Sequence, residues 1–438
     1  MAGERWQKYL RFLRCRDERC YACLSQAAAE RLIQHHVTGN AKTQNVFGIH
    51  RSSLNSAQNV FCYQDPMQEL DELCYLTSQS LTSMVTSEHF KVLKKLGEGS
   101  YGKVMLAVHR KRGTPMALKF FPRRSTTLLA FLREYNLSLT FCTHPSLTRA
   151  LGIFFSTPSH YIFAQQAALY GDLYDVIVSE VGVNEEQAQS VMSQLSGAVS
   201  HLHSLGFVHR DIKPENVFLY DRNCRWVKLG DFGLVRARGA QVRPVWYNSP
   251  FCVPEVEQAK EGQKGSKGEE EEEEEEETWM SVEPSLDSWA LGILIYCLLT
   301  GCFPWEESTS DDPGFCKFRD WFNYMKEKED REGGQNGWSH GNKNDRRDGG
   351  KGAEVAVPSQ FESLSSLALT LLRKLLNPLP WLRAGPDEIL SYLGGAWLLE
   401  TERQEKRREK EAQEEAKKLR EGGRGVEEDK GRQGRRER

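Results

Sequence analysis

Short apolar segments separated by glycine and charged turns open the globular part of this chain, and longer segments with helical spacing follow. Residues 90–96, 104–109 and 116–121 are apolar or loosely alternating, which is typical of β-strands. Glycine, threonine and basic turn residues separate these segments, as in an antiparallel meander. The pattern predicts a small β-rich lobe that begins near residue 90.

Apolar residues recur at helical spacing farther along the chain. Between residues 185 and 205 they lie three or four positions apart, which is typical of a helix with one buried face. They are Val191, Leu195, Val199 and Leu202. Segments 289–299 and 364–376 are also expected to be helices. A smaller β-rich lobe followed by a larger α-rich lobe predicts an α+β fold with two lobes.

Polar low-complexity segments interrupt and flank this pattern. Nine consecutive glutamates, 269–277, lie in a Gly-, Lys- and Glu-rich insert predicted for 259–281. A second polar insert is predicted for 326–353. The expected organisation is a mostly irregular leader (1–85), a globular domain with both inserts (90–398) and a charged, partly helical tail (399–438).

Charge and composition narrow the possible partners only a little. The 438 residues carry 58 basic and 61 acidic side chains, which gives a formal net charge of −3. Without the nine consecutive glutamates, the rest of the chain is mildly basic. The tail carries both signs, so nucleic-acid binding is not expected. No segment has the roughly 18 apolar residues of a membrane span, and no apolar signal segment begins the chain. We therefore expect a cytoplasmic protein.

Cysteines near the start of the chain raise a separate possibility. Cys20 and Cys23 form a C-x-x-C pair, with Cys15 nearby and His35 downstream. A structural zinc site needs a second pair of ligands at suitable spacing, and none follows. An irregular or weakly helical leader is the preferred interpretation of this region.

A glycine pattern lies between two of the predicted strands. Gly97, Gly99 and Gly102 form G-x-G-x-x-G, for which three phosphate-binding interpretations compete. A Rossmann fingerprint needs a following helix and an acid about 20 residues on, and neither is indicated. A Walker loop fits the spacing to Lys103, but Val104 lacks the hydroxyl that binds Mg²⁺. A strand–turn–strand flap over ATP phosphates also fits, as does an ordinary glycine hairpin.

One lysine stands inside an apolar strand. Lys119 follows Ala117 and Leu118 in the third predicted strand. A buried ammonium group is costly unless it is paired, and Glu134 on the following helical segment is a possible partner. Such an ion pair would aim the ammonium group at the α- and β-phosphates of ATP. The alternative is a surface lysine on an edge strand.

Two further motifs decide between these alternatives. The chain contains H-R-D-I-K-P-E-N, ending at Asn216, and then D-F-G, beginning at Asp231. Their order and spacing match the protein-kinase pattern. Asp211 would accept or orient the proton of a substrate hydroxyl, and Lys213 would neutralise charge on the transferring phosphoryl group. Asn216 and Asp231 would supply oxygen ligands to Mg²⁺.

On these motifs, residues 90–398 resemble a eukaryotic protein kinase domain, and Lys213 resembles the serine/threonine-specific members. Over residues 68–398 the chain is similar to the SH3-domain-binding kinase family, in segments 81–90, 131–134, 163–165, 219–225 and 298–305. The resemblance implies a bilobal α+β fold, ATP and Mg²⁺ as cofactors, and transfer of the γ-phosphoryl group to serine or threonine hydroxyls of proteins.

The resemblance also implies residue roles. Asp211 and Lys213 would be catalytic, and Asn216 and Asp231 would bind the metal. Arg383 resembles a late arginine that pairs with Glu255. The nucleotide would be bound by Leu96, Gly97, Glu98, Gly99, Ser100, Tyr101, Gly102, Lys103, Val104, Ala117, Lys119, Glu134 and Asp172.

The substrate platform departs from the family pattern. Asn248 stands near the position of a threonine, and Phe251 replaces a tyrosine. We expect an active kinase, and the alternative is a weak kinase or a pseudokinase that acts as an ATP-binding scaffold. None of the 16 prolines lies three positions from another. The chain thus has no P-x-x-P motif, and SH3 binding is not supported.

Overall fold

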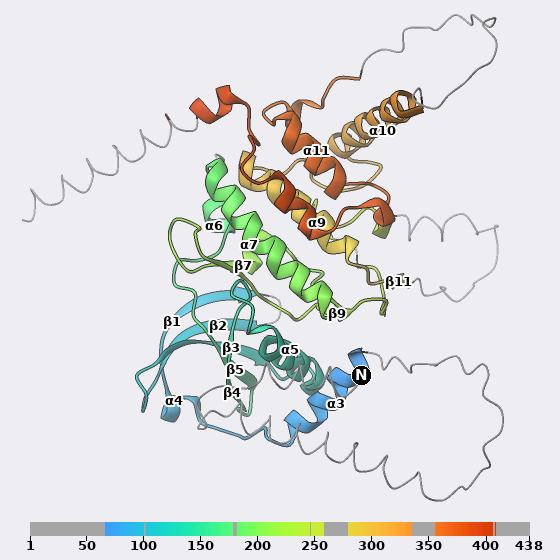
Figure 1. The fold of residues 1–438 in the computed structure, drawn as a ribbon. Helices are drawn as coiled ribbons and strands as arrows, with labels where there is room; N and C mark the ends of the chain where they lie inside the picture. The colour runs from blue at the N-terminus through green and yellow to red at the C-terminus, as the bar shows by residue number, and fades with distance from the viewer. Residues whose placement is uncertain are drawn as a thin grey trace, which may run out of the picture.

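A smaller part built on a β-sheet and a larger helical part make up the fold in the computed structural model (Figure 1). This arrangement confirms the predicted α+β class with two lobes. The structure describes residues 66–99, 102–177, 182–245, 247–257, 279–334, 355–405 and 408.

The smaller part contains a five-stranded antiparallel sheet with the strand order β1-β2-β3-β5-β4. All three strands expected from the sequence are present. The central strand, β3, is buried from Met116 to Lys119. The strands are β1 Phe90–Gly99, β2 Gly102–His109, β3 Pro115–Pro122, β4 Ala150–Ser156 and β5 His160–Gln165.

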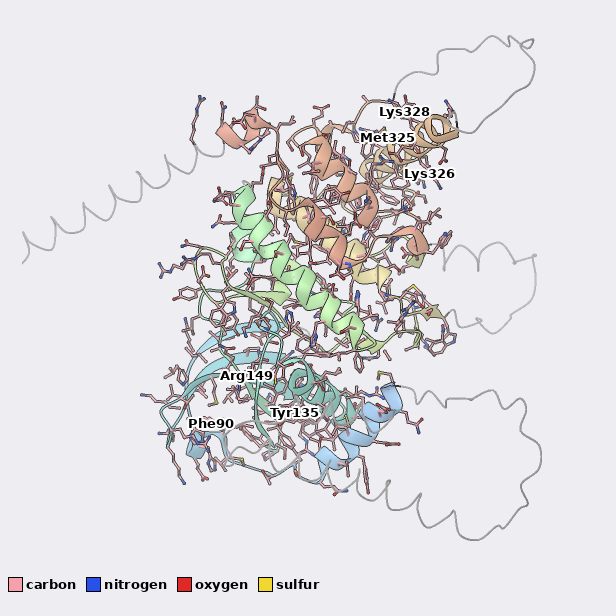
Figure 2. All side chains as sticks on the ribbon, in the orientation of Figure 1. Phe90, Tyr135, Arg149, Met325, Lys326 and Lys328 are labelled. Atoms are coloured by element: carbon pink, nitrogen blue, oxygen red, sulfur yellow. The ribbon has the colours of Figure 1, made fainter. Side chains whose placement is uncertain are left out.

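Helix α5 (Leu128–Phe141) packs on this sheet through aromatic side chains. The ring of Phe131 stacks on Tyr161 with 5.1 Å between centroids, and the ring of Tyr135 lies 4.5 Å from that of Phe154. Figure 2 labels Tyr135 on α5 and Phe90 at the start of β1, both within the smaller part. Because aromatic rings in contact leave little room for sliding, this packing sets the distance between α5 and the sheet.

Helix α9 (Ser285–Thr300) is the centre of the larger part. Every residue from Asp287 to Leu299 is buried, as expected of a helix that is covered on all sides. Helices α7 (Glu185–Ser204) and α11 (Ser366–Leu375) pack against it. The three helices expected from apolar spacing are therefore present, with ends close to the predicted ones.

Pairs of short strands and several further helices complete the described part of the fold. Strand β6 pairs with β9, β7 with β8, and β10 with β11. These strands are β6 Phe207–Val208, β7 Val217–Leu219, β8 Val227–Leu229, β9 Arg236–Ala237, β10 Gln241–Val242 and β11 Met280–Ser281. Among the described residues, further helices are α3 Pro66–Ser78, α4 Thr86–His89, α6 Tyr174–Ile177, α10 Pro313–Gly334, η1 Pro214–Asn216, η2 Ser359–Phe361, η3 Pro380–Leu382 and η4 Pro386–Tyr392.

Three of these elements lie wholly or partly in segments that the sequence predicted to be irregular or of low complexity. Helix α3 lies in the predicted irregular leader, because it buries apolar side chains against α5. Strand β11 lies at the end of the first predicted insert, where pairing with β10 orders it. Helix α10 continues into the second predicted insert, where Glu327 and Arg331 form an i,i+4 ion pair of 3.0 Å.

Most of the remaining low-complexity sequence lies outside the described residues. This holds for the nine glutamates, for the pair Cys20 and Cys23, and for most of the charged tail, of which residues 400–405 are helical. Within the part of the chain that the structure describes, no helix is both long enough and apolar enough to cross a membrane.

Asp287, at the start of α9, holds the loop that follows β6. Its carboxylate accepts hydrogen bonds from the backbone N–H groups of His209 and Arg210, each at 2.8 Å, and is hydrogen-bonded to His203 Nε2 at 2.8 Å. The residue is 1% exposed. Burial alone would raise the pKa of Asp287, but the hydrogen bond and charge of His203 lower it overall. Arg210 has a φ of 69°, so these bonds also hold a left-handed backbone.

Replacing Asp287 with asparagine is expected to lower the free energy of unfolding by about 2–3 kcal/mol at neutral pH. The variant loses charge-assisted hydrogen bonds and turns an amide NH₂ group toward backbone donors. Because the folded-state pKa of Asp287 is below its ordinary value, its stabilisation is complete above that value and lost as the pH falls through the folded-state pKa. Denaturant unfolding across this range should therefore show a deficit that shrinks in acid.

The control for this experiment is Asp320→Asn, the same chemical change at an exposed position of α10. It should unfold like the wild type. A deficit for Asp287→Asn that stays constant with pH would contradict the assigned role of the carboxylate charge.

Candidate active site

The predicted glycine loop is a hairpin between β1 and β2. Gly99 pairs with Gly102, and a strand rather than a helix follows the glycines. Rossmann and Walker loops both lead into a helix, so the strand excludes them. Gly102 has a φ of 140°, and a Cβ atom there would collide with the carbonyl of Phe120, so glycine is required. Ser100 and Tyr101 lie outside the described residues.

The sheet register brings several predicted nucleotide-binding residues onto one face. Val104 lies opposite Lys119, and Ala117 is two positions from Lys119 on the same strand. Residues two apart on a strand point to the same face, so these three side chains share one face of the sheet. The other predicted residues of the hairpin are Leu96, Gly97, Glu98 and Lys103, all within β1 or β2.

Lys119 is the meeting point of three elements. Its Nζ lies 2.5 Å from Glu134 Oε1 on α5 and 3.0 Å from Asp231 Oδ1. The lysine side chain is only 9% exposed. The structure thus contains the ion pair with Glu134 that the sequence predicts, and it adds a second carboxylate from the loop after β8.

The two carboxylates keep the buried ammonium group charged. Burial alone would lower the pKa of Lys119, but Glu134 and Asp231 raise it overall. Burial raises the pKa of Glu134, while the charge of Lys119 opposes this shift. Burial also acts to raise the pKa of Asp231, but Lys119 lowers it overall. Each charge of the cluster has a partner at hydrogen-bond distance, so removing one partner would leave a buried charge without compensation.

Asp211 is held by two side chains of its own loop. Lys213 Nζ lies 2.9 Å from Asp211 Oδ1, and Asn216 Nδ2 donates to Asp211 Oδ2 and to its backbone carbonyl, each at 2.8 Å. The three residues are brought together by η1, which begins with Pro214 directly after Lys213. The loop therefore fixes the direction of the Asp211 carboxylate.

His209 joins this loop to the one that carries Asp231. The buried imidazole accepts a hydrogen bond from Asp211 N at 3.2 Å and lies 3.1 Å from the Gly230 carbonyl through Nε2. Asn216 contributes a further link, since its carbonyl accepts from Gly230 N at 2.9 Å. Phe232 packs edge-on against His209 and against Phe141 of α5. Asp211, Asn216 and Asp231 are therefore positioned by one connected set of contacts.

Asp172 lies in the connection between β5 and α6. It forms an isolated bridge with Phe218, and its carboxylate accepts a hydrogen bond from Asp175 N at 3.3 Å. Burial and the nearby charge of Asp175 raise the pKa of Asp172. The structure thus places this residue beside β7, which directly follows Asn216.

The donor set fits Mg²⁺ bound together with a nucleotide. Among the described residues, no group of three or more His, Cys, Asp or Glu side chains is placed to hold a metal ion by itself. Mg²⁺ commonly uses one or two protein oxygens together with phosphate oxygens and water. Asp231 offers a carboxylate, and Asn216 donates through its amide nitrogen, which leaves the amide oxygen as its ligand atom.

The segment before Glu255 is packed against the helical part. Glu255 forms a bidentate ion pair with Arg383, at 2.6 and 2.8 Å, as the sequence predicts. The carbonyl of Pro250 accepts from Trp289 Nε1 at 2.9 Å and from Ser308 Oγ at 3.1 Å. These contacts hold the segment that contains the unusual Asn248 and Phe251.

Sequence reasoning missed two supports of the site. It gave Asp287 no role, although the carboxylate of this residue holds the backbone of His209 and Arg210. Helix α3 was not predicted, although it contacts the helix that carries Glu134. Neither feature has a local signal, because both act on parts of the chain that are distant in sequence.

Comparison with known proteins agrees with this geometry. The family model described as protein kinase domain matches residues 90–393. Serine/threonine-protein kinase SBK1 of Danio rerio is 36% identical over 331 residues, which cover 76% of this chain and 75% of that protein. Serine/threonine-protein kinase SBK2 of Mus musculus is 37% identical over 366 residues, covering 82% and 86%.

A more distant relative is serine/threonine-protein kinase meng-po of Drosophila melanogaster, which is 28% identical over 320 residues, or 73% of this chain and 60% of that protein. The extent of these matches shows the family directly. The chain belongs to the protein kinase family, among serine/threonine-protein kinases of the SBK1 and SBK2 type.

Proposed function

We propose that this chain transfers the γ-phosphoryl group of ATP to a serine or threonine hydroxyl of a protein substrate. The observation that carries the proposal is that Lys119, Asp231 and Asp211 belong to one site. Lys119 pairs with Glu134 at 2.5 Å and with Asp231 at 3.0 Å, and Asp211 pairs with Lys213 at 2.9 Å. Phosphoryl transfer needs positioning and charge stabilisation more than covalent chemistry by the protein. A connected set of fixed charges meets that need.

The sheet would bind the nucleotide. Lys119 donates to phosphate oxygens, and Glu134 holds the ammonium group in place for this contact. The backbone of the β1–β2 hairpin covers the phosphates, since glycines allow a close approach. Val104 and Ala117 offer apolar contacts to the base from the same sheet face, and Asp172 accepts hydrogen bonds from the ribose.

The loop after β6 would act on the substrate hydroxyl. Asp211 accepts the hydroxyl proton at its carboxylate. Lys213 and Asn216 orient this carboxylate, Lys213 by contacting Oδ1 and Asn216 by donating to Oδ2. Lys213 also stabilises negative charge on the group being transferred. Asn216 and Asp231 would hold Mg²⁺, which when bound with ATP neutralises charge on the phosphate oxygens.

Several contacts favour this activity over an ATP-binding scaffold. Asp211 is oriented within its own loop, so its direction does not depend on the unusual Asn248. The segment before Glu255 is anchored through Pro250 and through Arg383 despite the replacement at Phe251. Protein substrates in the cytoplasm are part of the same proposal, and the sequence offers no P-x-x-P ligand for SH3 partners.

Asp211→Asn is expected to reduce kcat about 10²–10⁴-fold, because the amide cannot accept the hydroxyl proton. ATP affinity should change little, since Asp211 is not among the residues proposed to contact the nucleotide. The measurement is phosphate transfer from labelled ATP to a generic protein substrate in the presence of Mg²⁺. The control, Asp320→Asn, should retain full activity, and equal transfer by wild type and Asp211→Asn would exclude the enzymatic role.

Glu134→Gln is expected to lower kcat/KM for ATP about 10–100-fold, because the lost charge leaves Lys119 without its nearest counter-ion. Lys119 would then be drawn to Asp231, its other partner at 3.0 Å. Steady-state kinetics at varied ATP concentration measure the effect. Glu329→Gln, which removes the charge of a different ion pair in the helical part, is the matched control. Equal kcat/KM values for the two variants would contradict the role of Glu134.

A further inference from the structure

Helix α3 (Pro66–Ser78) lies outside the matched kinase domain, yet it packs directly against α5 (Figure 1). Its side chains Leu70 and Cys74, four positions apart, are buried in the same apolar core as Phe131 and Tyr135 of α5. Helix α3 therefore extends the core of the smaller lobe beyond the kinase domain itself.

Polar contacts lock the two helices in one relative position. Arg133 donates to both carboxylate oxygens of Asp71, from Nε at 2.6 Å and from Nη2 at 2.5 Å. The hydroxyl of Thr77 donates to Asn136 Oδ1 at 3.0 Å, and Asn136 Nδ2 lies 3.4 Å from the sulfur of Cys74. Bidentate pairs and buried side-chain hydrogen bonds depend on geometry, so they specify the position of α5.

The α5 residues in these contacts flank the residue that pairs with Lys119. Arg133 directly precedes Glu134, and Asn136 follows it by two positions. Helix α3 also contacts β9, which lies in the segment after Asp231. One helix outside the kinase domain thus touches both the element that carries Glu134 and the segment that follows Asp231.

We propose that α3 is a positioning element for the nucleotide site. Through Asp71 on Arg133, and through Thr77 on Asn136, it holds α5 where Glu134 keeps Lys119 aimed at the phosphates of ATP. The inference rests on the proposed function, because it assumes that Lys119 contacts those phosphates.

The physical basis is a shift in population between positions of α5. A displacement of α5 by a few ångströms breaks the 2.5 Å contact of Glu134 with Lys119, and Lys119 then keeps only Asp231. Contacts made in one position alone favour that position by their full free energy. Loss of the α3 contacts should therefore weaken the binding of phosphates while leaving the binding of the base and ribose intact.

The experiment compares Mg²⁺-ATP with adenosine by calorimetric titration of the full chain. Asp71→Ala and Arg133→Ala should each weaken ATP binding about fivefold and leave the dissociation constant for adenosine unchanged. The exchanged pair, Asp71→Arg with Arg133→Asp, should recover ATP affinity to within about twofold. Glu329→Ala, which removes a bidentate pair with Arg373 in the helical part, should bind both ligands like the wild type.

Each outcome decides the inference. The inference is overturned if the ratio of the two dissociation constants stays unchanged in the alanine variants, whether both ligands bind as before or both bind more weakly by the same factor. It is also overturned if the exchanged pair does not recover ATP binding. If an alanine variant does not fold, the isosteric Asp71→Asn carries the same comparison. A wild type that binds ATP without transferring phosphate contradicts the proposed function alone, and one that binds neither ligand overturns both.

Discussion

The burial of one ammonium group constrains the rest of this structure. Lys119 is largely removed from water at the centre of the sheet, and an unpaired charge there would be strongly unfavourable. Its two partners come from a helix and from the loop after β8, which are far apart in the chain. Stabilising Lys119 therefore requires the sheet, α5 and that loop to meet, and the same meeting creates the site.

The larger lobe also contains a buried charge that needs partners, in this case a carboxylate. Asp287 is enclosed at the start of α9, and its hydrogen bonds go to the backbone of the loop that carries Asp211. The partners of this carboxylate are backbone N–H groups and a histidine, whereas Lys119 is paired with charged side chains. Since α9 is buried along nearly its whole length, a helix that is packed on all sides fixes the loop with the proposed proton acceptor.

Local patterns predicted those parts of the site that are defined by local chemistry. Strand patterns located three of the five strands of the sheet, and the cost of a lone lysine in an apolar strand predicted the partner Glu134. The positions of α3 and Asp287 were not predictable in this way, because their partners are distant in sequence. Asp71 of α3 lies 62 residues from Arg133, and Asp287 lies 77 residues from Arg210. Spacing along one element carries no information about a contact made only after folding.

The balance of charge in the site favours a cation beside the nucleotide that the proposed function requires. Two ammonium groups, of Lys119 and Lys213, face three carboxylates, of Glu134, Asp231 and Asp211, so these five groups carry one net negative charge. A polyphosphate would meet repulsion there unless a cation accompanied it. A scaffold that only held the nucleotide would be better served by fewer carboxylates. The presence of Asp211 and Asp231 together therefore fits the proposed transfer better than nucleotide binding alone.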